Sequence, residues 1–326
     1  MLLDGTDASA VERAAQMLAD GELVAIPTET VYGLAARADD DAAVARIFEA
    51  KGRPADHPLI VHVAEPDGAL QFASDMPAVA RRLADAFWHG PLTLILPRAA
   101  GMAEAAAARQ NTIGVRCPSH PVARAVLAAA HRLGVPGAAA PSANRFGRIS
   151  PTQATHVIDE FGDGLAVLDG GACDVGIESS IVDCSRGHPV LLRPGVLTQV
   201  QLEFAAGEPL LAADADAPRA PGTLAAHYAP NATLRLMSQQ MLTSALQVLG
   251  DVPLKLAVYS RSVPLSAAKG VRHRRMPLKP DQAAHELFSV LRELDAEGAQ
   301  LIWVEEPPAE PEWDGVRDRL LRAAAA

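Results

Sequence analysis

Residues 23–34 read Leu23-Val24-Ala25-Ile26-Pro27-Thr28-Glu29-Thr30-Val31-Tyr32-Gly33-Leu34. The four apolar residues at the start, 23–26, predict a short buried strand that ends before Pro27. Hydroxyls, a carboxylate and a glycine follow at the carboxyl end of that strand, which is where open α/β sheets bind ligands. The same residue types also suit a capped turn, so this stretch alone leaves a structural and a ligand-binding interpretation open.

Further strands and helices interleave through the first 200 residues. Predicted strands cover 59–63, 92–96, 113–116, 137–140, 165–168, 180–184 and 190–193. Predicted helices cover 9–20, 39–50, 77–88 and 121–133. One more helix is predicted to begin at Pro151, with Ser150 as its N-cap. Because the later strands cluster, we expect a mixed rather than a purely parallel sheet.

Residues 205–222 interrupt this pattern. They are rich in Ala, Asp and Pro and lack periodicity, which is typical of a semi-extended linker. Beyond them, predicted strands at 254–259 and 301–304 and predicted helices at 281–296 and 312–325 indicate a small α/β unit. We therefore expect a domain over 1–204, a linker or lid over 205–230 and a C-terminal domain over 231–326.

The charge of the chain is unevenly distributed. The 326 residues include 29 Lys and Arg against 39 Asp and Glu, for a net charge of -10. Residues 231–326 hold 12 basic and 12 acidic side chains, so the whole excess lies in residues 1–230. Six basic residues of that acidic half nevertheless lie in loop-like segments: Lys51, Arg53, Arg116, Arg145, Arg148 and Arg193. This pattern suits a pocket for an anionic small molecule, but it also suits solvated surface charges.

Several classes of protein are disfavoured. An acidic chain with 4% aromatic residues is a poor non-specific nucleic-acid binder. The three cysteines have no CxxC spacing, which argues against a disulfide framework or a zinc cluster and fits a reducing cytoplasm. We find neither a signal peptide nor a run of eighteen apolar residues, so we expect a cytoplasmic protein without a membrane partner. The motifs GxxxxGK[ST], GxGxxG and HExxH are absent.

Four more segments carry polar and cationic groups: 51–59, 112–116, 139–152 and 176–195. Lys51 and Arg53 lie two residues apart, with Gly52 between them and Pro54 after them, and resemble a phosphate clamp. Arg116 ends a short predicted strand and can pair with a carboxylate. Ser150 at a predicted helix N-terminus suits phosphate binding through backbone N–H groups and the helix dipole.

Together these segments resemble the YrdC-like threonylcarbamoyl-AMP synthase family over roughly residues 8–200. The resemblance rests on PTETVYGL, KGRP with HPLIVHV, GPLTLIL, TIGVR, PSANRFGRISPT and ESSIVD as a spaced set. The linker end through His227 and Tyr228, with the C-terminal α/β unit, resembles the long form of that family. The implied fold is α/β: a YrdC-like twisted mixed sheet with flanking helices, joined by a long linker to a smaller Rossmann-like domain.

The resemblance implies a nucleotidyltransferase. L-threonine, bicarbonate and ATP, with Mg2+, would give threonylcarbamoyl-adenylate and pyrophosphate. A separate threonylcarbamoyl-transferase complex would then modify tRNA, so no stable nucleic-acid binding by this chain is expected. Such a reaction needs no protein nucleophile, because positioning and charge stabilisation suffice. That is consistent with segments rich in cations and hydroxyls and without a catalytic triad.

The same resemblance implies roles for single residues. Threonine would contact Thr30, His62, Arg116, Ala140 and Ser180. ATP would contact Arg53, His57, Thr112, Ser142, Asn144, Ser150, Arg193 and Tyr228. Charge on the phosphates would be stabilised by Lys51 and Arg53, and no residue is expected to hold a metal of its own. Two departures from the family are His89, where a proline is usual, and the absence of a basic residue before His227-Tyr228.

Three alternatives compete with this interpretation. A YrdC-like module could bind double-stranded RNA without catalysis, in which case RNA binding would be salt-sensitive and independent of ATP. A carbamoyltransferase of the hydrogenase-maturation type would need zinc-finger cysteines and further domains. The chain could also be a scaffold whose C-terminal domain binds a partner.

Overall fold

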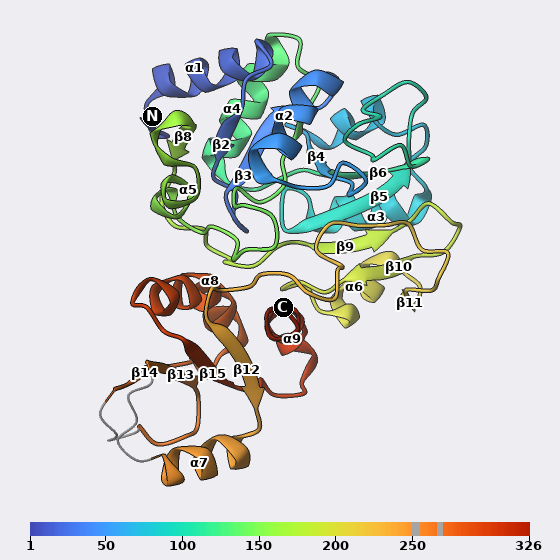
Figure 1. Ribbon diagram of the computed structural model, residues 1–326. Helices are drawn as coiled ribbons and strands as arrows, with labels where there is room; N and C mark the ends of the chain where they lie inside the picture. The colour runs from blue at the N-terminus through green and yellow to red at the C-terminus, as the bar shows by residue number, and fades with distance from the viewer. Residues whose placement is uncertain (250–254, 266–269) are drawn as a thin grey trace. The chain divides into compact units, whose positions relative to one another are not determined.

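The structure, a computed structural model, describes residues 1–249, 255–265 and 270–326 and forms two compact units (Figure 1). Unit 1 comprises Met1–Phe146 and Ser150–Thr223, and unit 2 comprises Gly147–Ile149 and Leu224–Ala326. The boundary between Thr223 and Leu224 falls inside the stretch predicted as a linker. None of the helices in the described ranges is both long and apolar enough to span a membrane.

Unit 1 is built on a mixed sheet in the order β1-β8-β2-β3-β7-β4-β6-β5-β9-β10-β11. The strands are β1 (Leu2–Asp4), β2 (Val24–Ile26), β3 (Gly33–Arg37), β4 (Ile60–His62), β5 (Leu92–Pro97), β6 (Thr112–Arg116), β7 (Ala138–Ala139), β8 (Ala166–Asp169), β9 (Ser180–Asp183), β10 (Val190–Arg193) and β11 (Leu211–Ala212). Parallel pairs such as β4 with β6 stand beside antiparallel pairs such as β5 with β6. The prediction of a mixed sheet is confirmed.

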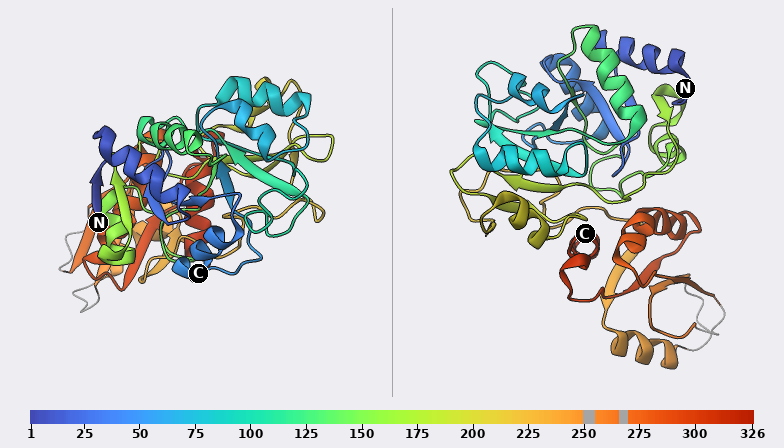
Figure 2. Two further views of the ribbon diagram at one scale, coloured as in Figure 1. Left: turned by 90° about the horizontal axis from the view of Figure 1, so that it is seen from above. Right: turned by 180° about the vertical axis from the view of Figure 1, so that it is seen from behind.

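Helices cover both faces of this sheet. They are α1 (Ala8–Ala19), α2 (Asp41–Lys51), α3 (Ala78–Phe87), α4 (Pro121–Arg132), α5 (Ala154–Phe161) and α6 (Gln199–Ala206), with short 3-10 turns at Pro66–Gln71 and Gly162–Gly164. Helices α1 and α4 lie side by side and share one core cluster with Val24 and Ile26 (Figure 2). Helices α2 and α5 contribute to another cluster with Ala25. Successive strand residues point to opposite faces, so both faces are buried.

Unit 2 contains a fully parallel sheet in the order β12-β15-β13-β14. Its elements are β12 (Thr233–Met237), α7 (Gln239–Val248), β13 (Leu256–Ser260), β14 (Val271–Arg275), α8 (Pro280–Ala296), β15 (Leu301–Glu305), a 3-10 turn (Pro311–Trp313) and α9 (Asp314–Ala324). The predicted strands at 254–259 and 301–304 and both predicted helices are confirmed, although Leu254 lies outside the described residues. Strands β12 and β14 were not predicted.

The predicted linker is less irregular than its composition suggested. Helix α6 continues to Ala206, and β11 pairs in parallel with β10, so residues up to 212 extend the sheet of unit 1. His227 and Tyr228 belong to unit 2, where the Tyr228 ring lies 5.4 Å from that of Phe288. The stretch 205–230 is therefore divided between the two units.

Candidate functional site

Unit 1 buries four cationic side chains among its described residues. Lys51, Arg53, Arg116 and Arg193 expose 2%, 8%, 4% and 3% of their surface. Burying a charge is costly unless it is paired and hydrogen-bonded, so such groups mark places where function outweighs that cost. These four are among the six loop cations that the sequence singled out, whereas Arg145 is exposed.

The sheet aligns a row of buried polar side chains. His62 on β4 is the register partner of Arg116 on β6, and Arg116 is the partner of Thr93 on β5. Register partners on neighbouring strands present their side chains to the same face. His62, Thr93 and Arg116 therefore come from three adjacent strands to one surface, although 54 residues separate the first from the last in sequence.

Arg116 connects this row to the Thr28-Glu29-Thr30 turn after β2. Its Nη1 donates to Thr30 Oγ1 at 2.8 Å, and its Nη2 lies 2.7 Å from Glu29 Oε1 as an ion pair. The turn is internally fixed, because Thr28 Oγ1 accepts from the backbone of Thr30 and Val31 and donates to Val31 O. Burial is the largest influence on the pKa of Glu29 and raises it, but the charge of Arg116 and the nearby N–H groups of Arg116, Glu29 and Ser119 together hold the pKa below its ordinary value.

His62 is neutral in this environment. Burial, reinforced by the charge of Arg116, lowers the pKa of His62 to about 3. Its Nδ1 has no hydrogen-bond partner within the described part of the chain. A neutral buried imidazole nitrogen of this kind can accept a hydrogen bond from a ligand hydroxyl or donate one, depending on its tautomer.

Lys51 lies at the end of α2 and holds the loop of the PSAN motif. Its Nζ donates to the backbone carbonyls of Ser142, at 2.5 Å, and Asn144. The backbone N–H of Phe146 donates to Lys51 O at 2.9 Å. Burial, and then the neighbouring Arg53, set the pKa of Lys51 well below its ordinary value. Two segments about 90 residues apart are thereby joined around one cation.

Arg53 and His57 meet the same loop. Arg53 Nη2 donates to Pro58 O at 3.0 Å, and its guanidinium carbon lies 5.8 Å from the centre of the Phe146 ring. The His57 ring contacts that of Phe146 edge to face at 5.4 Å. Burial, followed by the charge of Arg53, lowers the pKa of His57.

A second group of buried polar side chains, with Arg193 as its cation, surrounds the ESS motif. Arg193 on β10 donates through Nε and Nη2 to Ser179 O, at 3.1 and 2.9 Å. The hydroxyls of Ser179 and Thr93 lie 2.8 Å apart, and Ser180 is fully buried at the start of β9. Thr93 is also the register partner of Arg116. It therefore joins the polar residues around Ser179 to the polar row that contains Arg116.

The prediction that Ser150 caps a helix is wrong. Helix α5 begins at Ala154 with Gln153 as its N-cap, and the backbone carbonyl of Pro151 instead accepts from Tyr32 N at 2.8 Å. Ser150 is buried and donates to Glu178 Oε1 at 2.5 Å. Ser150 therefore offers a phosphate no helix dipole, and its neighbour is a carboxylate.

The other predicted site residues are dispersed. Thr112 begins β6, and Ala140 N donates to Ile60 O at 3.0 Å beside the polar row. Asn144 Nδ2 donates to Arg145 O. Tyr228 belongs to unit 2 and has a positive φ of 63°. Four further residues belong to this polar surface but were not predicted as site residues: Glu29, Thr93, Glu178 and Ser179. Three of them lie in the PTET and ESS motifs.

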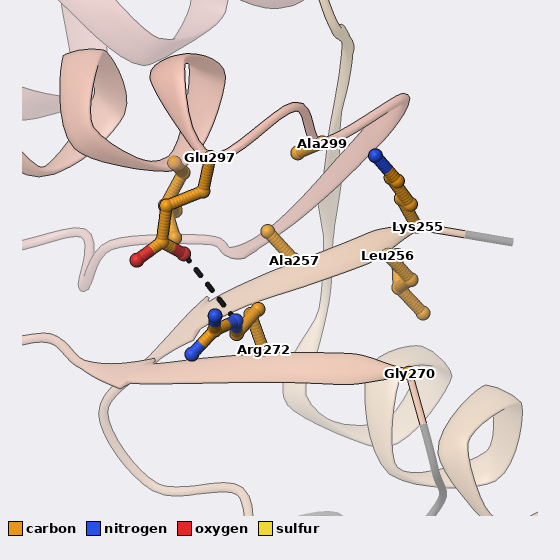
Figure 3. A pocket seen from close by; sticks show the side chains of 8 residues that line it. Lys255, Leu256, Ala257, Gly270, Arg272, Glu297 and Ala299 are labelled. Carbon is orange, nitrogen blue, oxygen red and sulfur yellow. Dashed lines mark ion pairs between the residues drawn. The ribbon is translucent and has the colours of Figure 1, made fainter.

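Unit 2 contains a pocket of its own, of about 200 Å3 (Figure 3). It lies at the amino ends of β13 and β14 and is lined by Lys255, Arg272 and Glu297 around an apolar floor. Arg272 Nε is 3.5 Å from Glu297 Oε2, and its side chain is 74% exposed. Open α/β sheets bind ligands at the carboxyl ends of their strands, so this position is atypical of a ligand site.

Two family models account for nearly the whole chain. Residues 16–195 match Sua5_yciO_yrdC, described as telomere recombination. The chain belongs to this family. Residues 196–325 match Sua5_C, described as the threonylcarbamoyl-AMP synthase C-terminal domain. The resemblance drawn from the sequence motifs is confirmed.

Curated relatives and solved structures agree with this membership. Threonylcarbamoyl-AMP synthase of Pyrococcus abyssi is 44% identical over 225 residues, which are 67% of this chain and 65% of that protein. The protein of the same name from Bacillus subtilis is 35% identical over 96% of this chain and 92% of its own length. The crystal structure of P. abyssi Sua5 complexed with L-threonine matches 99% of this chain and 97% of that chain, with 33% identity and a TM-score of 0.90.

Proposed function

We propose that the chain is an L-threonylcarbamoyladenylate synthase, which forms threonylcarbamoyl-AMP and pyrophosphate from L-threonine, bicarbonate and ATP. The observation that carries the proposal is the burial of four cations in unit 1, in a family whose relatives bear this name. A triphosphate and two carboxylate-bearing reactants place concentrated negative charge in one site. Buried cations stabilise such charge far more effectively than exposed ones do.

We divide the residues into two groups, as the family resemblance implies. We assign threonine to Thr30, His62, Arg116, Ala140 and Ser180, because the first three meet around Arg116. We assign ATP to Arg53, His57, Thr112, Ser142, Asn144, Ser150, Arg193 and Tyr228, with Lys51 and Arg53 stabilising charge on its phosphates. Lys51 also orders the loop that carries Ser142 and Asn144, so its contribution includes positioning.

The proposed reaction needs no covalent intermediate with the protein. The neutral amine of threonine adds to the carbon of bicarbonate and water leaves, which gives the carbamate. The carbamate oxygen then attacks the α-phosphorus as pyrophosphate leaves. Mg2+ enters as part of the MgATP substrate, since this ion commonly binds substrate phosphates and keeps several waters. The described residues contain no group of three or more His, Cys, Asp or Glu that could hold a metal ion.

The product places the enzyme in tRNA modification. We propose that a downstream transferase complex carries the threonylcarbamoyl group to tRNA and that the synthase works in the cytoplasm. The net charge of -10 argues against a stable complex of this chain with tRNA, because nucleic-acid affinity depends on neutralised phosphates.

The test is product formation by the purified full chain. Incubation with L-threonine, ATP, Mg2+ and 13C-bicarbonate should release pyrophosphate and give labelled threonylcarbamoyl-AMP in a mass spectrum. Omitting threonine or bicarbonate is the control, and each omission should abolish the product. Absence of the product, together with salt-sensitive binding of double-stranded RNA without ATP turnover, would favour the non-catalytic RNA-binding module instead.

A further inference from the structure

The turn after β2 places a second charged residue, Glu29, in the proposed amino-acid pocket. Glu29 is 4% exposed, and its backbone carbonyl accepts from Val175 N at 2.7 Å. The rigid Thr28 hydroxyl network fixes the residues on either side. The position of the carboxylate is therefore set by the fold and not by solvent.

Three buried polar groups meet here without a complete set of hydrogen bonds. Within the described residues, neither oxygen of Glu29 receives a hydrogen bond of full geometry, although the N–H groups of Arg116 and Ser119 lie near enough to lower its pKa. Arg116 Nη2 and His62 Nδ1 also lack such a bond. The contact of 2.7 Å between Glu29 and Arg116 is an ion pair whose angle falls outside the hydrogen-bond range. Buried polar groups are nearly always satisfied in folded proteins, so three such groups at one place point to a ligand that satisfies them.

The chemistry of these groups fits one class of ligand. The carboxylate of Glu29 accepts hydrogen bonds, the guanidinium of Arg116 donates them, and the neutral imidazole of His62 has one nitrogen to bond. An α-amino acid that carries a hydroxyl offers an ammonium, a carboxylate and a hydroxyl. The pair Glu29 and Arg116 has no net charge, which favours a zwitterion over an anion.

We propose that Glu29 binds the α-ammonium of the amino-acid substrate and so makes the pocket specific for zwitterions. This inference rests on the proposed function and adds a specificity-determining residue to it. Arg116 takes the carboxylate, and Glu29 takes the ammonium that a hydroxy acid of the same shape lacks. A purely structural Glu29 would only hold Arg116 in place, and it would then affect all carboxylate ligands equally.

The experiment compares two ligands on one variant. The dissociation constants of L-threonine and of 2,3-dihydroxybutanoate of matching configuration, in which a hydroxyl replaces the ammonium, are measured by calorimetry for the wild type and Glu29→Gln. We expect the preference for threonine to fall by about tenfold or more in Glu29→Gln, since a charge-assisted hydrogen bond is lost. Equal weakening of both ligands, with the preference unchanged, would overturn the proposal.

Controls keep the outcome interpretable. Glu12→Gln alters another Glu–Arg pair, the exposed one with Arg132 at 2.6 Å, and should leave the preference unchanged. If Glu29→Gln does not fold, Glu29→Asp is used, which keeps the charge but shortens its reach. A reduced preference in Glu29→Asp supports the proposal, whereas a wild-type preference with equal weakening of both ligands overturns it.

The role of Glu29 and the proposed reaction are tested by different measurements, ligand binding and pyrophosphate release. Binding of the amino acid requires no turnover, so the ligand preference is measurable even if no pyrophosphate is released. If the wild type forms threonylcarbamoyl-AMP but Glu29→Gln retains the preference, only the role of Glu29 is overturned. If the wild type forms no product, the proposed function fails, while a lowered preference in Glu29→Gln still assigns the ammonium to Glu29.

Discussion

The two units of the chain use charge in opposite ways. Unit 1 is acidic in composition, yet its described residues bury four cations that converge on the PSAN, PTET and ESS motifs. The C-terminal 96 residues are neutral in composition, and the described part of unit 2 buries one cation, Arg319, which pairs with Asp318 at 2.8 Å. Net charge therefore says little about where chemistry occurs, whereas the burial of single charges is informative.

The comparison predicts the largest effect for Arg116→Met. This substitution leaves Glu29 buried without its partner, which typically costs about 3–5 kcal/mol of stability. Urea denaturation should show that loss, and the double variant Glu29→Gln with Arg116→Met should recover part of it. Arg132→Met, which removes the exposed partner of Glu12, should change the free energy of unfolding little. A similar loss of unfolding free energy in Arg116→Met and Arg132→Met would contradict the expected difference between a buried and an exposed ion pair.

The next largest effect is expected for turnover in Lys51→Met. The variant lacks both the buried charge and the two bonds to the loop carbonyls, so pyrophosphate release should fall about 100- to 1000-fold. The matched control is Lys255→Met in unit 2, where the lysine is exposed and lines the pocket. Lys255→Met should turn over like the wild type, and limited proteolysis should reveal a loosened 141–149 loop only in Lys51→Met.

His62 gives unit 1 a defined sensitivity to acid. Its pKa is lowered to about 3 in the folded state, while the unfolded chain takes up that proton near the ordinary value of 6.5. The contribution of neutral His62 to the free energy of unfolding is therefore complete above pH 6.5. It decreases as the pH falls from 6.5 towards 3. Between pH 7 and 5 the wild type should lose about 2 kcal/mol more than His62→Gln in urea denaturation. Equal losses in both proteins would mean that folding does not lower the pKa of His62.

Many strands of the fold were predictable from local sequence. The strands at 59–63 and 92–96 combine apolar runs with clear boundaries. Four of the six cations in loop-like segments are buried, although the sequence left open whether they were surface charges. Strand β14, by contrast, reads Val-Arg-His-Arg-Arg, which has no apolar alternation because it is the edge strand of its sheet. Only its pairing with β13 makes it a strand.

The parts of the site that the sequence could not reveal depend on long-range contacts. Thr93 is a single hydroxyl in the apolar strand LTLIL, and its partner Ser179 lies 86 residues away. The pairing of β5 with β9 brings them together, and no local pattern encodes it. Ser150 was misassigned for a related reason. The serine–proline pair is typical of a helix start, but here Pro151 O accepts from Tyr32, and the helix begins three residues later.

The smallest effect is expected for Arg272→Gln at the pocket of unit 2. This variant tests whether an exposed cation of unit 2 contributes as little as the comparison with the buried cations of unit 1 predicts. Arg272 is largely exposed and 3.5 Å from Glu297, so the pair contributes about 0–1 kcal/mol. Turnover should also be unchanged, because this pocket lies at the amino ends of the parallel strands and no buried charge faces it. A pyrophosphate-release rate lowered tenfold, with the urea midpoint unchanged, would show that an exposed cation of unit 2 contributes to the reaction. Burial would then not be the property that distinguishes the catalytic charges.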